Sequence, residues 1–453
     1  MYKLLASLVL LLGLLPCAAV AMTDNLDPLQ MDIPRGQLTL DQAQRLALKN
    51  SPGIAEAVAR IEAAEAVVDQ AKASLWPQLS LNAGYRLQNS TMQPDWAPEI
   101  RKQDSFNNLT AGLQANWLLF DGFARKARIL SAQYAGEAEA AGLQETRRLL
   151  ADAVANAFYQ AQLAAESMLI ARNNQQFNKQ LEADADKRWQ VGTIPESEKL
   201  NFSVRALQAE SDYLNAGQNF EVISKVLAEL LALPGAELPQ QFYPASTTGK
   251  VHSKEIPDLE VELDYALEHR SDLKILKAQL AAMVEQKKVK QGSYYPKIGL
   301  YGGLKYSDLN GVGTIDLEEH DRYLGLNLTW DLFTGGARPA QVREVDRKAT
   351  QIRHQLEQKI LAVQSQIGQA GTRARQTYAM YQRHQAALQM TVRIRDHIEK
   401  SYRAGVTTLT RLNEAQRDLV QMAGQAIYSR INYQMALKDL ETASGRRLAE
   451  LSY

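Results

Sequence analysis

The chain has 453 residues, and its 51 basic and 51 acidic side chains give a formal net charge of zero. That balance offers no basic excess of the kind that nucleic-acid-binding proteins use. Aromatic residues make up only 7 % of the sequence, and the frequent Ala and Gln favour long helices over a thick globular core.

Residues 1–21 read as a secretory signal peptide. Lys3 supplies the positive charge, and Leu4 to Leu15 form an apolar segment that is too short to span a bilayer. The small residues Ala19 and Ala21 flank Val20 as in a cleavage site, so we expect the mature chain to begin at Met22.

The single cysteine, Cys17, allows a second interpretation, in which the chain is lipidated there. Pro16 precedes it, where lipoprotein signals carry a small residue, so simple cleavage is favoured. The mature protein then has no thiol, which excludes disulfides, thiolate metal sites and cysteine catalysis.

Residues 22–233 are predicted to form a first structural repeat. A helix is expected near 38–75, because Ile54, Ile61 and Val68 recur every seven residues, as in coiled coils. Strands at 78–88 and 106–119, a long helix at 122–190 and a helix at 196–233 follow. Residues 234–257, rich in Pro, Ser and Thr, read as a connector.

Residues 258–453 repeat this order. A helix is expected near 258–293, with strands at 296–307 and 320–333, a long helix at 335–403 and a helix at 408–446. Each long helix would make a rod of roughly 100 Å at 1.5 Å per residue. A compact domain needs no such rod, but a tunnel across an envelope compartment does.

Four landmarks indicate that the halves are copies of one pattern. The motif W-x-L-F-x-G-x-A-R begins at Trp117 and again at Trp330, and an aromatic-x-x-Gly motif ends at Gly192 and again at Gly405. Both recur 213 positions apart. Trp76-Pro77 and Tyr295-Pro296, like Ala47-Leu48 and Ala266-Leu267, are 219 apart. The first half therefore carries a loop about six residues longer.

The four strand segments alternate strictly between apolar and polar residues. Leu79, Leu81 and Tyr85 would face one way, and Ser80 and Asn82 the other. About ten residues with period two fit a tilted membrane strand with a lipid face and a wet face. Soluble amphipathic hairpins are the other interpretation, but they do not explain four matched lengths. The polar loops 89–105 and 308–320 would then lie outside the cell.

Four strands cannot close a membrane barrel, since the smallest barrels have about eight. After the signal, no stretch has the ~18 consecutive apolar residues of a membrane helix. Copies of the chain must therefore complete the sheet if it crosses a membrane. Two copies would give eight strands and three would give twelve, and the physics does not choose between them.

Proline and glycine mark the expected element boundaries. Pro77 and Pro296 stand where helix gives way to strand. Gly122 and Gly335 mark the return from strand to helix. Gly192 and Gly405 follow the long helices, where a left-handed glycine ends a helix. Thr193 or Ile194 with Pro195, and Thr407 or Thr408, would start the next helices.

With these features in place, the chain resembles the TolC-like outer membrane efflux protein family over about 38–446. The resemblance rests on the duplicated order of strands and helices and on the two motifs that occur in both halves. It implies an α+β membrane protein, a homotrimer with a 12-stranded transmembrane β-barrel continuous with a periplasmic α-helical tunnel. It also implies a location in the outer membrane and two partners, a periplasmic adaptor (membrane fusion) protein and an inner-membrane transporter.

The resemblance further assigns a periplasmic aperture, which acidic side chains line. Glu198 and Glu414 match acidic positions, and Tyr402 matches a tyrosine of the gate network. Arg411 departs from the family, where the best-known member has an acid. Arg411 and Glu414 would share a helix face and could neutralise each other. An ordinary solvated helix face is an equally weighted interpretation of Glu198, Arg411 and Glu414.

Enzyme chemistry is not indicated. The sequence has none of the motifs GxxxxGK[ST], GxSxG or HExxH, and its six histidines share no metal-binding spacing. We therefore expect no catalytic residue, cofactor or metal. The expected function is an outer-membrane exit duct of a tripartite efflux or type I secretion system, and a structural periplasmic coiled-coil tether or adaptor is the alternative.

Overall fold

The computed structural model describes residues 37–92, 102–238, 257–311 and 317–446. They all belong to one unit, Gln37–Tyr453. The predicted signal peptide, its cleavage site and Cys17 lie outside the described residues, as does most of the connector.

Each half opens with two helices instead of the single helix that the sequence predicted. Near 38–75 the structure has α2 (Leu40–Asn50) and α3 (Pro52–Ala73). Ser51 between them is extended, with φ −65° and ψ 122°, and Pro52 opens α3. A residue before proline disfavours the helical conformation, so the prediction of one continuous helix was wrong.

The second half breaks at the matching place. Helices α6 (Leu259–His269) and α7 (Ser271–Gln291) are separated by the extended residue Arg270. No proline marks this break. Arg270 is buried and hydrogen-bonded to other helices, so tertiary contacts fix the break where local sequence does not.

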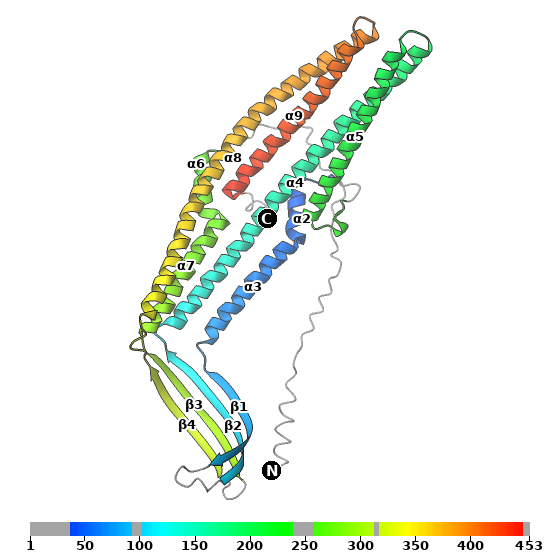
Figure 1. Cartoon of the computed structure of the whole chain (residues 1–453). Coiled ribbons are helices and arrows are strands. Elements are labelled where there is room, and N and C mark those ends of the chain that lie inside the picture. Colours follow the sequence, from blue (N-terminus) through cyan, green and yellow to red (C-terminus); the bar gives the residue numbers. More distant parts are fainter. Residues whose placement is uncertain (1–36, 93–101, 239–256, 312–316, 447–453) are drawn as a thin grey trace. The chain divides into compact units, whose positions relative to one another are not determined.

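Four antiparallel strands form one sheet in the order β1-β2-β3-β4 (Figure 1). The strands are β1 (Gln78–Met92), β2 (Lys102–Phe120), β3 (Lys297–Gly311) and β4 (Leu317–Thr329). β1 and β3 run four residues past their predicted ends, because backbone pairing continues through polar residues that break no alternation, as far as Met92 opposite Lys102.

The register aligns apolar residues of neighbouring strands over the part of the sheet nearest the helices, whereas farther along Leu109 lies opposite Asp308 and Leu304 opposite Arg322. Leu81 lies opposite Leu113, and Leu113 opposite Leu304. The polar residues align one step along, with Ser80 opposite Gln114. The predicted apolar face is therefore continuous across the strands, and it is open: Leu81 is 62 % exposed and Leu324 79 %.

Two 67-residue helices dominate the chain, α4 (Ala124–Gln190) and α8 (Ala337–Arg403). Each begins two residues later than predicted because the residues before it are left-handed, Gly122-Phe123 in one case and Gly335-Gly336 in the other. α5 (Glu196–Leu230) returns along α4, and α9 (Leu409–Ser444) returns along α8 (Figure 1). Short 3₁₀ turns, η1 (Pro234–Ala236) and η2 (Gly292–Tyr294), follow α5 and α7.

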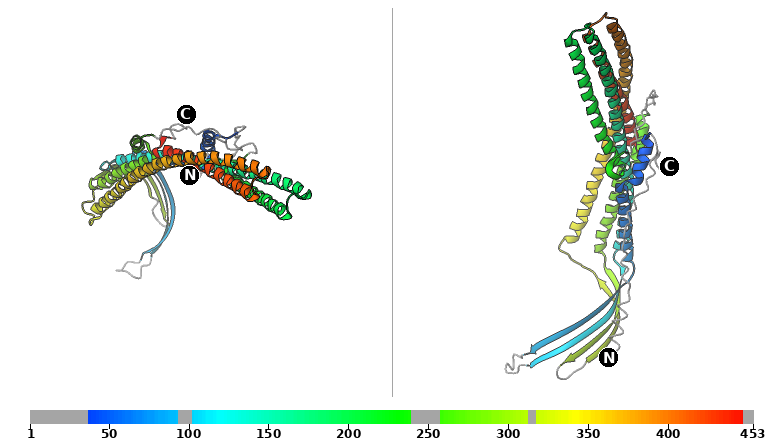
Figure 2. Two further views of the ribbon diagram at one scale, coloured as in Figure 1. Left: turned by 90° about the horizontal axis from the view of Figure 1, so that it is seen from above. Right: turned by 90° about the vertical axis from the view of Figure 1, so that its right-hand side faces the viewer.

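The helices lie in a curved layer instead of closing on themselves (Figure 2). Their buried contacts are rich in alanine. On α4, many buried alanines alternate with a few larger residues such as Val154 and Phe158. Small side chains let long helices approach closely along their length. One cluster of larger residues joins α6, α7, α8 and α9, and it comprises Ala266, Leu273, Val363, Ile367, Ala370 and Leu440.

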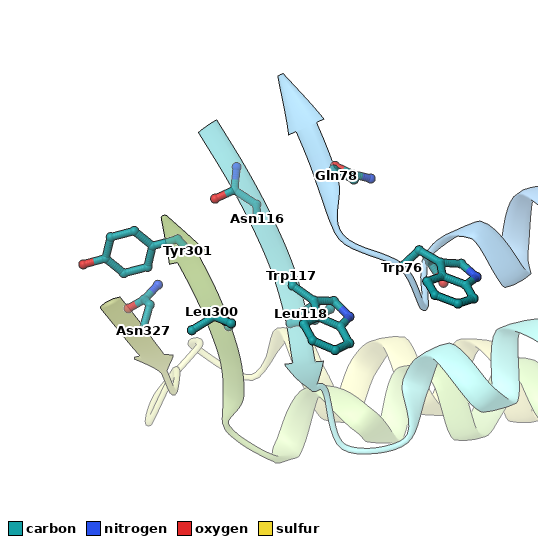
Figure 3. Close-up of a pocket in the computed structure, with 10 residues that line it drawn as sticks. Trp76, Gln78, Asn116, Trp117, Leu118, Leu300, Tyr301 and Asn327 are labelled. Carbon is teal, nitrogen blue, oxygen red and sulfur yellow. The ribbon is translucent and has the colours of Figure 1, made fainter. Parts of the chain in front are cut away.

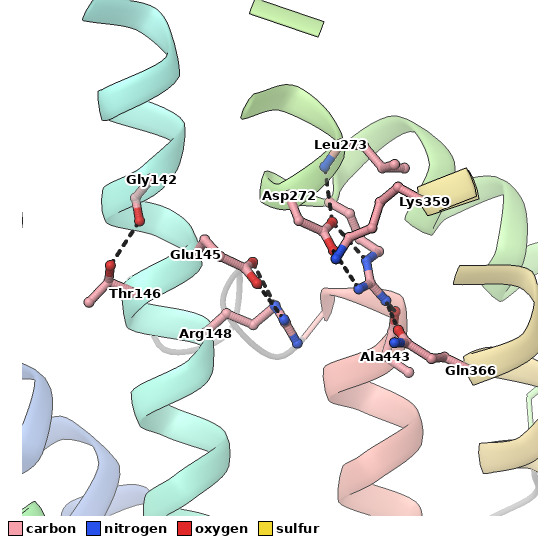
Figure 4. Close-up of polar contacts among 10 residues, drawn as sticks. Gly142, Glu145, Thr146, Arg148, Asp272, Leu273, Lys359, Gln366 and Ala443 are labelled. Carbon is pink, nitrogen blue, oxygen red and sulfur yellow. Dashed lines mark hydrogen bonds and ion pairs between the residues drawn. The ribbon is translucent and has the colours of Figure 1, made fainter. Parts of the chain in front are cut away.

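A buried polar cluster holds the same helices together (Figure 4). Arg270 donates to both oxygens of Asp272, at 3.1 and 2.7 Å, and to the carbonyl oxygen of Ala443 at 2.7 Å. Lys359 from α8 lies 3.1 Å from Asp272. Burial would raise the pKa of Asp272, but the hydrogen bonds and charge of Arg270, with Lys359, outweigh it and lower the pKa to about 2.

Among the helices of the described ranges, none carries an apolar stretch long enough to cross a membrane.

Candidate functional site

Two helix turns form the tips predicted at Gly192 and Gly405. Gly192 has φ +75° and Gly405 φ +74°, a left-handed conformation that glycine adopts without strain. The amide of Thr193 donates to the carbonyl of Arg188 at 2.8 Å, and the amide of Val406 donates to that of Ser401 at 2.9 Å. Both turns thus satisfy the carbonyl groups that end a helix.

The helices that follow the tips start differently in the two halves. Pro195 caps α5 without a side-chain hydrogen bond, and the hydroxyl of Thr193 instead donates to the carbonyl of Arg188 at 2.8 Å. Thr408 caps α9 by accepting from the amide of Arg411 at 3.4 Å. The prediction of a cap at Thr193 or Ile194 was therefore wrong, since Pro195 itself is the cap, whereas Thr408 is one of the two residues predicted for the second helix.

A hydrogen bond between side chains links the two tips. The hydroxyl of Tyr402, at the end of α8, donates to Oε1 of Glu198, in the first turn of α5, at 2.9 Å. These two candidates are 204 positions apart in the sequence. The tyrosine therefore connects the two hairpins, α4–α5 and α8–α9.

The surroundings of Tyr402 favour its neutral form. Burial raises its pKa first, and the hydrogen bond to Glu198 and the negative charge of that carboxylate add to the effect, giving a pKa of about 12. Arg188 opposes the shift, with its guanidinium carbon 5.6 Å from the ring centroid. The phenol is consequently a donor over the whole physiological pH range.

A small apolar cluster supports this hydrogen bond. Leu181 and Ala185 of α4, Phe202 of α5 and Leu412 of α9 are buried together, and Tyr402 packs against them. The rings of Phe202 and Tyr402 are 6.4 Å apart. Because these residues come from both hairpins, separating the hairpins would expose the cluster as well as break the hydrogen bond.

The other two aperture candidates stand apart from this contact. Arg411 and Glu414 are both exposed on α9. Within the part of the chain that the structure describes, no ion pair joins them. The structure thus brings Glu198 and Tyr402 together and leaves Arg411 and Glu414 on a solvated surface.

Sequence reasoning missed three residues of this region. Arg188 lies over the ring of Tyr402, and Lys199 lies 3.9 Å from the ring centroid of Trp189 and 2.8 Å from Asp186. The signal was present, since an arginine directly precedes the aromatic residue of the first tip motif. It was too common a pattern to be singled out.

The strand–helix junctions of the two halves share one contact. The indole N–H of Trp117 donates to the carbonyl of Leu75 at 2.9 Å, two residues before Pro77. The indole N–H of Trp330 donates to the carbonyl of Tyr294 at 3.2 Å, two residues before Pro296. Each tryptophan thus ties the returning strand to the end of the incoming helix.

Gly122 and Gly335 differ in their surroundings. A Cβ at Gly122 would lie 2.6 Å from the carbonyl oxygen of Gly292 and 2.8 Å from Tyr295. A Cβ at Gly335 would meet nothing within 4 Å. The first junction is packed within the chain, and the second is open.

A cavity of about 650 Å³ lies at the first junction (Figure 3). Its lining combines Trp76 and Trp117 with the polar residues Gln78, Asn116 and Asn327. It is placed where the polar face of the sheet meets the helices, and it contains no grouping of acids, histidines or nucleophiles.

The comparisons with known proteins agree with this architecture. A family model described as "Outer membrane efflux protein" matches residues 43–233 and 263–446. Protein CyaE of Bordetella pertussis is 26 % identical over 387 residues, covering 84 % of this chain and 78 % of CyaE. The outer membrane protein TolC of Vibrio cholerae is 23 % identical over 423 residues, covering 88 % of this chain and 89 % of TolC.

Among solved structures, the Campylobacter jejuni CmeC outer membrane channel superposes with a TM-score of 0.77 at 17 % identity, covering 91 % of this chain and 89 % of CmeC. At that identity the likeness shows the shared fold. The family model, by contrast, covers most of the sequence in two matches that together include the strands, the long helices and both tips. The chain belongs to the outer membrane efflux protein family.

Proposed function

We propose that the protein is the passive outer-membrane exit duct of a tripartite efflux or type I secretion system. The observation that carries the proposal is the sheet: one face is apolar and exposed across all four strands, and the other is polar. An exposed apolar face of this extent fits lipid. The sheet also has two open edges, which lipid does not tolerate.

Three copies of the four-stranded sheet would supply twelve strands, and a closed barrel of that size leaves no open edge. The curved helix layer supports the same assembly (Figure 2), because three curved layers complete a tube. Each 67-residue helix would line it for about 100 Å. We propose a homotrimer on these grounds.

The internal duplication is part of this proposal. The family model matches the two halves separately, and the tryptophan contacts at Trp117 and Trp330 recur at the same two offsets as the sequence motifs. A further likeness is that Arg125 and Arg338, equivalent in the motif, each donate to a backbone carbonyl of the preceding segment.

The tips are proposed as the periplasmic aperture. Tyr402 and Glu198 join the two hairpins, so their hydrogen bond would hold each chain in a joined state. Arg411 and Glu414 would line the opening as exposed charges. Val191 and Val406 stand beside the tip glycines and are 74 and 80 % exposed, which suits contact with a periplasmic adaptor that connects to an inner-membrane transporter.

Membrane fractionation tests the proposal against its alternative. The duct should remain in the outer-membrane fraction after a salt wash, dissolve only in detergent and have the mass of a trimer. A periplasmic tether or adaptor without membrane strands would be released in the soluble fraction, and that result would overturn the proposal.

A further inference from the structure

The sheet leaves two strand edges without partners. β1 pairs only with β2, and β4 only with β3, within the described strands. Large apolar side chains beside these edges are open as well: Trp76 is 73 % exposed and Phe333 89 %. One open edge is that of β1, in the first half of the chain, and the other is that of β4, in the second half.

The two halves of the chain already pair with each other once, and this pairing of β2 with β3 is called the seam. β2 of the first half pairs with β3 of the second, with Asn116 opposite Tyr301 and Gly112 opposite Lys305. At the junction between the strands and the helices, Gly122 packs against the carbonyl of Gly292 and the ring of Tyr295. This seam shows how the end of one half fits the beginning of the next.

Applying the repeat offsets to the residue pairs of the seam predicts how the open edges pair. A shift of 213 moves β2 onto β4, and the reverse shift of 219 moves β3 onto β1. We infer that β4 pairs antiparallel with β1 of a neighbouring copy, with Thr329 opposite Asn82, Asn327 opposite Gly84 and Gly325 opposite Arg86. The inference rests on the proposed homo-oligomeric duct and deepens it.

Side-chain chemistry independently excludes every register that lies an odd number of residues away from this one. It places Leu328, Leu326 and Leu324 of one copy opposite Ala83, Tyr85 and Leu87 of the next. All six lie on the apolar face by the pairing of their own strands. A slip of one residue would put polar side chains into that face.

The same register creates a contact between copies on the polar face. The ring of Tyr301 covers Gly325, because a Cβ there would lie 2.6 Å from the ring. Arg86 of the neighbouring copy would stand opposite Gly325 and so beside that ring. Arginine stacks well on tyrosine faces. The wall of the duct would then carry one such arginine–tyrosine pair at every junction between copies.

The second helix–strand junction would close in the same way. Gly335 corresponds to Gly122, and Trp76 corresponds to Tyr295. Gly335 of one copy would thus receive Trp76 of the next, which explains why a Cβ at Gly335 meets nothing inside one chain and why Trp76 is exposed.

Cysteine pairs in the full-length protein test the register. Because Cys17 is the only native cysteine and lies in the predicted signal peptide, the introduced pairs are read without background. The double variant Asn82→Cys with Thr329→Cys should form a disulfide between copies under mild oxidation in membranes. The product is a covalent trimer, which a reductant separates into single chains.

Matched controls move one partner by two residues on the same face, Ser80→Cys or Gly84→Cys with Thr329→Cys. Directly opposed Cβ atoms lie about 4.5–5.5 Å apart and diagonal ones about 7–8 Å, so the inferred pair should react at least about tenfold faster. Gly84→Cys with Asn327→Cys is a second in-register pair, in case the first variant fails to assemble.

Faster bonding of an offset pair, or no bonding of either in-register pair in an assembled trimer, would overturn the inference. Oligomer mass, measured on the same sample, separates the two levels. A trimer that bonds in another register refutes only the register. A monomer refutes both the register and the proposed duct.

Discussion

Replacing Tyr402 by Phe removes one hydroxyl and leaves the ring in place. The lost contact is the 2.9 Å hydrogen bond to the Glu198 carboxylate. Hydrogen bonds to charged groups contribute about 1.5–3 kcal/mol. At 1.36 kcal/mol per factor of ten, the equilibrium between joined and separated hairpins should shift by roughly 10- to 150-fold per chain toward separation.

Single-channel recording of the purified variant in planar bilayers measures this shift as a larger open fraction or conductance. Tyr428→Phe is the matched control, because Tyr428 is exposed on α9 away from the tip. Glu198→Gln should act in the same direction but more weakly, because its amide oxygen can still accept the hydroxyl without the negative charge. The double variant should add little to Tyr402→Phe, since both changes act on the same hydrogen bond.

The pH dependence has a defined sign. Because the pKa of Tyr402 is raised to about 12 in the joined state, the stabilisation is fully present below the ordinary tyrosine pKa near 10 and is lost as pH rises toward 12. Tyr402→Phe should lack this additional opening at high pH, because it has no hydroxyl that titrates. Fully additive effects of Tyr402→Phe and Glu198→Gln, or a Tyr402→Phe variant as closed as the wild type, would show that this hydrogen bond does not hold the two hairpins together.

Three further predictions follow from other parts of the chain. Asp272→Asn leaves a buried arginine without its carboxylate and should lower the free energy of unfolding by about 3–5 kcal/mol; an unchanged urea midpoint would contradict it. Gly122→Ala forces a Cβ to within 2.6 Å of a carbonyl oxygen and should reduce the yield of assembled protein, whereas Gly424→Ala, with open space around it, should not. Glu198→Ala with Glu414→Ala should shift the reversal potential toward anion permeability, and an unchanged potential would remove both residues from the aperture.

The sequence was most informative where the surroundings of a segment impose a regular spacing of apolar and polar residues. Alternation located all four strands, and their register joins the apolar residues of different strands into one face. It misjudged strand ends in both directions: the backbone ladder of β1 continues through polar residues such as Asn89 and Ser90, whereas β4 ends at Thr329, before its predicted end at residue 333. The alternation reports on the faces of a strand and not on where pairing stops.

Contacts between distant segments were beyond sequence reasoning. The break at Arg270 has no proline or glycine, and it depends on a carbonyl of α9 and a carboxylate that are assembled only by the fold. The aperture candidates Glu198 and Tyr402 came from the family resemblance, and no spacing rule predicts a bond between residues 204 positions apart. Arg188 was missed because its role depends on the ring above which it lies.

The most direct test of the duct is planar-bilayer conductance of the detergent-extracted mature protein, with oligomer mass measured on the same sample. A passive duct predicts discrete conductance steps from a trimer without any added energy source. A homogeneous, folded sample that gives no steps, or that is a water-soluble monomer, would contradict the account.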